Sequence, residues 1–195
     1  MDLILADPPW LYSGAGTPGH GKADDHYGGM PAADVASDLF AARQKCKRDA
    51  WLVLWVTWPL LWEVMDDVVA GSGWEYLTGG SWHKDRARKG IGHHVEGDSE
   101  LWTLWRKGRP RTIERFSNAL NAKPGGHSQK PAEFVRRHVR AWSPEGGLVL
   151  DPYAGEHATF AKVCCTEGRR YIGAEVDPVR FDRAQKILKH WQEIS

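Results

Sequence analysis

The sequence predicts an α/β fold, with a Rossmann-like, mostly parallel sheet that carries helices on both faces. Short apolar runs typical of buried strands alternate with segments of helical apolar spacing along the 195 residues. The composition, 42% hydrophobic and 26% charged, is that of a globular protein. No internal repeat, linker or low-complexity tract interrupts the alternation. We therefore expect a single domain over residues 1–195.

The first half of the chain predicts four strands and two helices. Residues 3–6 form an apolar run that ends at Asp7, which predicts a buried first strand. Residues 11–31 are rich in Gly, Pro, His and Asp and have no hydrophobic period, so we expect a long functional loop there. Helices are expected at 32–46 and 59–70, and the other strands at 51–57, 74–82 and 99–105.

The second half continues the alternation after a basic, irregular stretch at residues 107–126. Pro131 and Pro178 each suit the first position of a helix. The expected helices cover residues 131–142, 156–167 and 178–192, and the expected strands cover 148–151 and 171–175.

Charge and cysteine content limit the classes of protein to consider. The net charge of +1 indicates no polyanionic partner for the molecule as a whole. Cys46, Cys164 and Cys165 form neither a paired framework nor a zinc-ligand spacing, so we expect a reducing, cytoplasmic compartment and no metal. No stretch approaches the roughly 20 apolar residues of a membrane span. Most of the eleven tryptophans are expected in the core.

Two segments stand where an open α/β sheet binds ligands, beyond the carboxyl ends of strands. The turn Asp151-Pro152-Tyr153-Ala154-Gly155 is followed by Glu175 after the next strand, which is the pattern of a grip on the ribose of a nucleoside cofactor. The full glycine-rich fingerprint is missing, so a cofactor without phosphates fits better. In Asp7-Pro8-Pro9-Trp10, a carboxylate and carbonyls could accept the protons of an amino group beside an indole face.

These residues together resemble a known family. Asp7-Pro8-Pro9-Trp10 after an N-terminal strand is similar to the catalytic signature of S-adenosylmethionine-dependent adenine-N6 methyltransferases. Further similar segments follow in order, beginning with residues 51–57 and 82–84; the others are residues 90–94, 100–102 and 127–131. Because the cofactor turn at 151–155 lies C-terminal to the catalytic motif, the order resembles the permuted β-class arrangement and implies the corresponding permuted topology.

The resemblance implies a role for each matching residue. Asp7, Pro8, Pro9 and Trp10 would be catalytic, with Asp7 and the Pro8 carbonyl accepting the amine protons and Trp10 stacking on the base. The implied contacts to S-adenosylmethionine come from both ends of the chain, namely Asp7, Lys84, Ser128, Lys130, Asp151, Tyr153, Ala154, Gly155 and Glu175. The family's turn usually continues with Ser-Gly-Thr, whereas this chain has Glu156-His157-Ala158-Thr159. We expect Glu156 to cap the helix that follows.

A cation-rich stretch between the two motifs predicts contact with nucleic acid. Clustered cations in flexible loops suit phosphates, and interleaved tryptophans suit displaced bases. The candidate residues are Arg86, Arg88, Lys89, His93, Arg106 and Arg109. With residues 11–31, the stretch 84–126 would carry substrate recognition. Adjacent His93 and His94 point in different directions, so we do not expect a metal site.

We therefore expect transfer of a methyl group to the exocyclic amine of adenine in DNA, in the cytoplasm of a bacterial or phage-infected cell, by a monomer or homodimer. A second subunit remains open. The alternatives are the same chemistry on RNA adenine or on a cytosine amine, since cytosine also carries an exocyclic amine. A third alternative is a non-catalytic nucleic-acid-binding subunit, although the intact Asp7-Pro8-Pro9-Trp10 motif argues against it.

Overall fold

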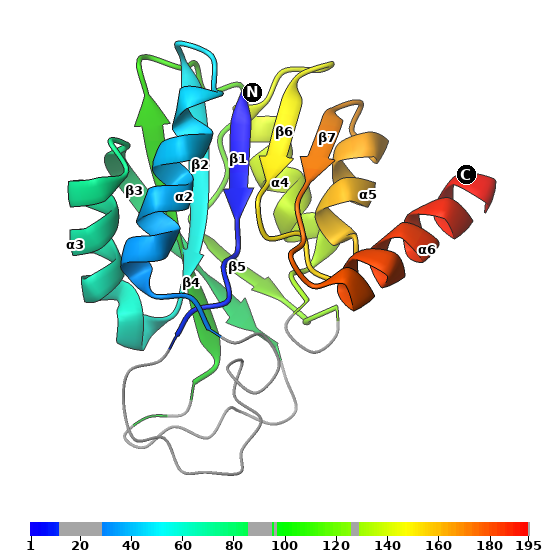
Figure 1. Cartoon of the computed structure of the whole chain (residues 1–195), viewed down its shortest axis with the longest axis horizontal. Coiled ribbons are helices and arrows are strands. Elements are labelled where there is room, and N and C mark those ends of the chain that lie inside the picture. Colours follow the sequence, from blue (N-terminus) through cyan, green and yellow to red (C-terminus); the bar gives the residue numbers. More distant parts are fainter. Residues whose placement is uncertain (12–28, 86–94, 96, 126–128, 195) are drawn as a thin grey trace.

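The computed structural model describes residues 1–11, 29–85, 95, 97–125 and 129–194. Seven strands form one sheet in the order β5-β3-β4-β2-β1-β6-β7 (Figure 1). The strands are β1 (Leu3–Ala6), β2 (Ala50–Val56), β3 (Glu75–Lys84), β4 (Ser99–Lys107), β5 (Ala119–Ala122), β6 (Leu148–Asp151) and β7 (Arg170–Gly173). The helices are α2 (Ala32–Gln44), α3 (Leu61–Gly71), α4 (Ala132–Trp142), α5 (Thr159–Thr166) and α6 (Pro178–Ile194), with a short 3-10 helix η1 (Trp58–Leu60).

The sheet is mostly parallel, as predicted. Strand β1 runs parallel to both its neighbours, β2 and β6, and the pairs β6 with β7 and β3 with β5 are also parallel. Strand β4 is antiparallel to both β2 and β3. The strands that precede the two predicted motifs, β1 and β6, thus lie side by side although they come from opposite ends of the chain (Figure 1).

Helices cover both faces of the sheet, which is the predicted arrangement (Figure 1). Side chains alternate across a strand, so Leu3 and Leu5 pack with α4 and α5 on one face, while Ile4 and Ala6 pack with α2 and α3 on the other. Eight of the eleven tryptophans are buried, which confirms that most of them belong to the core. Trp58 and Trp62, at the start of η1 and α3, are exposed instead.

Several predicted boundaries differ from the structure. Strand β5 lies inside the stretch 107–126 that we expected to be irregular. The helix expected from residue 156 begins at Thr159, because the cofactor turn extends to Ala158, whose φ is 55°. Strand β7 ends at Gly173, so Glu175 lies in the loop beyond it. The two adjacent cysteines of α5 differ in exposure, since Cys164 is buried and Cys165 is exposed.

The strand register brings the motif residues to one edge of the sheet. Ala6 pairs with Leu54, and Asp151 pairs with Gly173, so the chain leaves β1, β2, β6 and β7 at the same edge. Because β4 is antiparallel, its first residues, Ser99 and Glu100, lie at this edge too. Its last residues lie at the opposite edge, where Lys107 pairs with Ala50.

Candidate active site

A cavity of about 810 Å³ opens at the carboxyl edge of the sheet, within the range of small-molecule sites. It is lined by residues that follow β1, β2, β6 and β7, together with residues from β4 and from the segment before α4. The predicted residues on its wall are Asp7, Pro8, Pro9, Trp10, Lys130, Asp151, Tyr153, Ala154, Gly155 and Glu175. The two motifs that the sequence separates by most of the chain therefore line one cavity.

Asp7 lies at the end of β1, and its side chain is 29% exposed. The Lys130 ammonium donates a hydrogen bond of 2.6 Å to Asp7 Oδ2. Burial raises the pKa of Asp7 above its usual range, and the lowering effect of Lys130 does not cancel it. The two prolines that follow lack N–H groups, so the backbone here offers only carbonyl acceptors. The motif is therefore rich in acceptors.

Trp10 belongs to the wall of the cavity and is itself buried. Its Nε1 donates a hydrogen bond of 3.0 Å to the Trp55 carbonyl, which fixes the plane of the indole. The neighbouring backbone pairs with the chain entering α2, since the Leu11 amide donates to the Met30 carbonyl at 2.9 Å. Only the part of the ring that faces the cavity is therefore available to a ligand.

Lys130 also contacts a second carboxylate. Its Nζ lies 3.2 Å from Glu100 Oε2, and Lys84 donates to Glu100 Oε1. Burial alone would raise the pKa of Glu100, but the two lysines outweigh it and lower the pKa to about 2. The carboxylates of Asp7 and Glu100 in turn raise the pKa of Lys130, although burial alone would lower it. We call these four residues, Asp7, Lys130, Glu100 and Lys84, the charge cluster.

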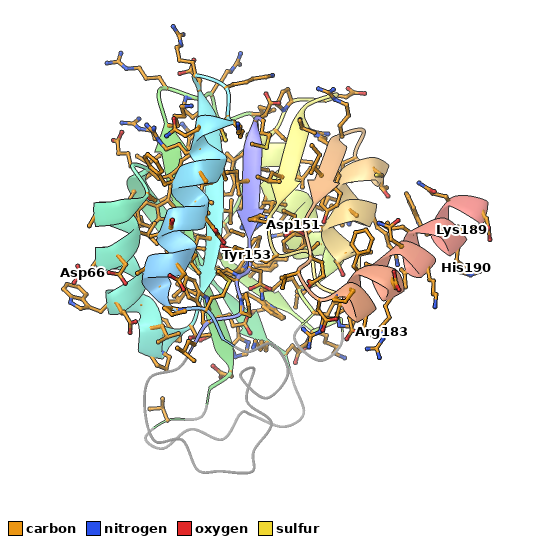
Figure 2. All side chains as sticks on the ribbon, viewed as in Figure 1. Asp66, Asp151, Tyr153, Arg183, Lys189 and His190 are labelled. Carbon is orange, nitrogen blue, oxygen red and sulfur yellow. The ribbon has the colours of Figure 1, made fainter. Side chains whose placement is uncertain are left out.

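The predicted cofactor turn is held by its own acids. Asp151 is buried, accepts a hydrogen bond from the Tyr153 amide at 3.1 Å and accepts a second from the Tyr171 hydroxyl at 2.8 Å. Burial raises the pKa of Asp151 to about 7. Figure 2 shows Asp151 and Tyr153 in the middle of the molecule, near the ends of β1 and β6. Asp151 therefore stabilises the conformation of the turn through hydrogen bonds.

Glu175 closes the turn from the other side. Its Oε2 accepts from the Gly155 amide and its Oε1 from the Asp177 amide, both at 2.9 Å. Gly155 has a φ of 62°, a conformation that glycine adopts without strain. Each carboxylate oxygen keeps a lone pair, so Glu175 could still accept hydrogen bonds from a ligand.

The structure corrects the role expected of Glu156. Ala158, not Glu156, is the N-cap residue of α5, and no side chain of the described residues makes a capping hydrogen bond to this helix. Glu156 Oε2 instead accepts a hydrogen bond of 2.6 Å from Arg183 of α6. The capping prediction was wrong, because the turn between Gly155 and the helix is longer than we expected.

The predicted nucleic-acid residues do not gather at the cavity in the described part of the chain. Arg106 lies at the opposite edge of the sheet and makes a two-pronged ion pair with Glu75. The Arg109 amide binds Asp49 at that same edge. Lys84 is at the cavity edge, in the charge cluster. The remaining candidates lie outside the described residues: Arg86, Arg88, Lys89, His93 and the cofactor candidate Ser128.

Sequence reasoning missed several residues of the cavity wall, including Asp38, Glu100, Gln129, Phe160 and Arg180. Glu100 had a signal, because it opens one of the segments, 100–102, that resemble the methyltransferase family. Among the described residues, no group of three or more His, Cys, Asp or Glu side chains is arranged to hold a metal. In the same part of the chain, no helix has the length and apolar content needed to cross a membrane.

Comparison with known proteins gives a family. Residues 41–186 match the model of the DNA methylase family. Over 115 residues, or 51% of this chain, the sequence is 36% identical to the orphan methyltransferase M.BamHII of Bacillus amyloliquefaciens. That match covers 42% of M.BamHII, so the chain matches less than half the length of this curated relative.

Solved structures share the fold over nearly the whole chain. The M1.HpyAVI–SAM complex matches 96% of this chain and 88% of its own, with a TM-score of 0.72 and 17% identity. The cytosine-N4-specific PvuII DNA methyltransferase matches 100% of this chain and 85% of its own, with a TM-score of 0.69 and 15% identity. The predicted Rossmann-like fold is thereby confirmed.

Proposed function

This chain belongs to the DNA methylase family, and we propose that it transfers a methyl group from S-adenosylmethionine to the exocyclic amine of adenine in DNA. The observation that carries the proposal is that Asp7 and the turn closed by Glu175 line the same cavity. Methyl transfer between two bound molecules requires one cavity that holds both the group that binds the substrate amine and the group that binds the nucleoside of the cofactor.

The cavity suits S-adenosylmethionine in size and charge. Among the described residues, its wall contains seven carboxyl side chains against the basic side chains of Lys130, His157 and Arg180; the acids are Asp7, Asp38, Glu100, Asp151, Glu156, Glu175 and Asp177. An acidic wall favours a cationic ligand and disfavours phosphates. When bound, S-adenosylmethionine supplies a methyl group on a positively charged sulfur. The M1.HpyAVI structure, of the same fold, is a complex with this molecule.

The proposed cofactor contacts follow from the hydrogen-bond acceptors of Glu175 and the donors of Lys130 that other residues do not use. Glu175 would accept hydrogen bonds from ribose hydroxyls through its remaining lone pairs. Lys130 has three N–H donors, of which Asp7 and Glu100 engage two, so one is left for the carboxylate of the cofactor. The backbone of Tyr153, Ala154 and Gly155 would border the methionine half.

Asp7 would act on the substrate amine. The lone pair of an adenine amine is delocalised into the ring, so the reaction needs groups that favour the pyramidal form as positive charge develops. Lys130 binds Oδ2 of Asp7, which leaves Oδ1 to accept a hydrogen bond from one amine N–H, and the Pro8 carbonyl would accept a hydrogen bond from the other. Trp10 would contact the base with the ring face that lines the cavity. Pro9 keeps the backbone of the motif stiff.

DNA is the proposed substrate because of the family, and the base would have to leave its duplex to reach the cavity. Phosphate contacts would come from residues 84–126, as the sequence suggests, with Arg106 and Arg109 contributing only if the DNA extends to the far edge of the sheet. Cytosine is a second candidate base, because PvuII DNA methyltransferase, of the same fold, is cytosine-N4-specific.

The test is a methyl-transfer assay with labelled S-adenosylmethionine and double-stranded DNA, single-stranded DNA or RNA, followed by digestion to nucleosides. Labelled N6-methyl-2′-deoxyadenosine from DNA is expected; label in the cytosine nucleoside would favour the second candidate. Asp7→Ala should lower kcat by about a hundredfold or more, the usual cost of losing a proton-accepting group. Cofactor binding, measured by calorimetry, should persist in this variant. Asp34→Ala, an exposed acid in the first turn of α2, serves as the control. Full turnover without the Asp7 carboxylate would disprove its role.

A further inference from the structure

Glu100 is a partly buried carboxylate of the cavity wall for which the proposed chemistry has no role so far. It lies on β4 opposite Trp82 of β3, and the two lysines reach it from different parts of the chain. Lys84, at the end of β3, binds one of its oxygens, and Lys130, from the segment before α4, lies against the other. The side chains of Glu100, Lys84 and Lys130 are only 18%, 13% and 7% exposed.

The burial of these charges requires that they balance. A buried ion is costly unless partners of opposite charge surround it, and the removal of one partner leaves the other uncompensated. The charge cluster contains two carboxylates and two ammonium groups, arranged in the order Asp7, Lys130, Glu100, Lys84. Glu100 is the central carboxylate of this chain of contacts, since it touches both lysines.

Glu100 therefore determines how Lys130 meets Asp7. Without Glu100, the Lys130 ammonium would have Asp7 as its one carboxylate partner within the cluster and could bridge both of the Asp7 oxygens. With Glu100 in place, Lys130 is drawn toward β4 and binds Oδ2 of Asp7. The other Asp7 oxygen is then left for the substrate.

We propose that Glu100 is a positioning residue for methyl transfer, which holds Lys130 so that Asp7 presents one unengaged carboxylate oxygen to the substrate amine. The inference rests on the proposed function. Glu100 also affects how readily Asp7 takes up a proton. The charged groups that act on Asp7 are Lys130 and Lys84, which lower its pKa, and Glu100, which raises it, while burial raises it most. Asp151, on the neighbouring strand β6, lies close enough for the two acids to influence each other.

The substitution Glu100→Gln keeps the shape of the side chain and removes its charge. The matched control is Glu75→Gln, because Glu75 also joins β3 to β4 through an ion pair, with Arg106, but at the opposite edge of the sheet. Glu100→Asp keeps the charge and withdraws it by one methylene, so it should restore part of the activity. Thermal unfolding of each variant monitors folding.

The expected result is a split between turnover and binding. In Glu100→Gln, kcat at saturating cofactor and DNA should fall by about tenfold or more, the equivalent of one charge-assisted hydrogen bond. The affinity for S-adenosylmethionine should not fall, since the two lysines lose a competing carboxylate. The acidic limb of the pH profile of kcat should move to lower pH, because the pKa of Asp7 falls when Glu100 loses its charge.

A second measurement does not need activity. Carbon-13 NMR titration of the Asp7 carboxyl group, without cofactor or DNA, should give a lower pKa in Glu100→Gln than in the wild type and the Glu75→Gln control. An unchanged Asp7 titration would overturn the inference, as would a kcat equal to that of the control. A wild-type protein that methylates no nucleic acid would refute the proposed function, whereas the NMR comparison would still show whether Glu100 acts on Asp7.

Discussion

His138 provides a quantitative test of how the core depends on pH. It lies on α4 with its ring fully buried, and its Nδ1 donates a hydrogen bond of 2.7 Å to the Phe134 carbonyl. Aromatic rings surround the imidazole, namely those of Trp55, Trp102, Phe116, Phe134 and Trp142. Its Nε2 has no hydrogen-bond partner among the described residues. Burial in this apolar shell lowers the pKa of His138 from 6.5 to about 3.

The sign and size of the effect follow from this pKa. A group whose pKa is lower in the folded state binds its proton more readily when unfolded. The stability that neutral His138 provides is therefore complete above pH 6.5 and is lost as the pH falls toward 3. Each unit of pKa difference corresponds to about 1.4 kcal/mol. Between pH 7.5 and pH 4.5 the histidine should thus account for a loss of about 3 kcal/mol in the free energy of unfolding.

The assay is urea unfolding of the wild type and of His138→Phe at both pH values. The substitution changes packing as well, but that contribution is the same at both pH values and cancels in the difference. The variant should lose about 3 kcal/mol less than the wild type on acidification. His190→Gln is the control, since His190 lies exposed on α6 (Figure 2). If wild type and His138→Phe lose equal stability on acidification, the buried imidazole is not the cause.

Two further predictions concern the cofactor turn. Glu175→Gln should weaken the affinity for S-adenosylmethionine by about tenfold, because a charge-assisted hydrogen bond to the ribose becomes a neutral one. Calorimetry measures this affinity, and an unchanged Kd would argue against the ribose contact. The pKa of Asp151 is raised to about 7, so its stabilising contribution is complete below pH 3.8 and is lost as the pH rises through 7. Between pH 5 and pH 9, the wild type should therefore lose about 3 kcal/mol more of its free energy of unfolding than Asp151→Asn does. Urea unfolding of both proteins at the two pH values checks this. The same difference in stability between the two proteins at both pH values would contradict it.

Local sequence was enough to predict the elements with strong local signals. The apolar run before Asp7 and Pro8 predicted β1, and Pro131 predicted the start of α4 within one residue. Strand β5 has no such signal, since its sequence is Ala-Leu-Asn-Ala. It is a strand because its backbone pairs with β3, from Ser81 with Ala119 to Lys84 with Ala122. The tendency of such a segment to form a strand depends on the neighbouring strand, and a local sequence pattern carries no information about that neighbour.

The basic stretch shows the same limit at the level of the site. Along the sequence, Lys84, Arg106 and Arg109 belong to one cation-rich region. In the structure they are separated, because β4 runs antiparallel from the cavity edge to the far edge and takes Arg106 with it. The direction of β4 depends on hydrogen bonds to β2 and β3. A charge pattern along the sequence therefore identifies cations but not the edge of the sheet that they reach.

Glu100 illustrates both limits of local sequence. It shows that the sequence can reveal some residues of an active site but not others. Asp7 and Glu175 could be placed at the cavity from the sequence because each follows a strand next to a local motif, and the carboxyl ends of strands in such sheets meet ligands. Glu100 lies within β4, between Ser99 and Leu101, and although the segment 100–102 resembles the family, the local sequence gives this carboxylate no role. Its importance comes from contacts with Lys84 and Lys130, which the register of β3 with β4 and the placement of the segment before α4 create. The groups that would touch the substrate are thus readable from local sequence, whereas the group that orients them depends on the pairing of distant strands.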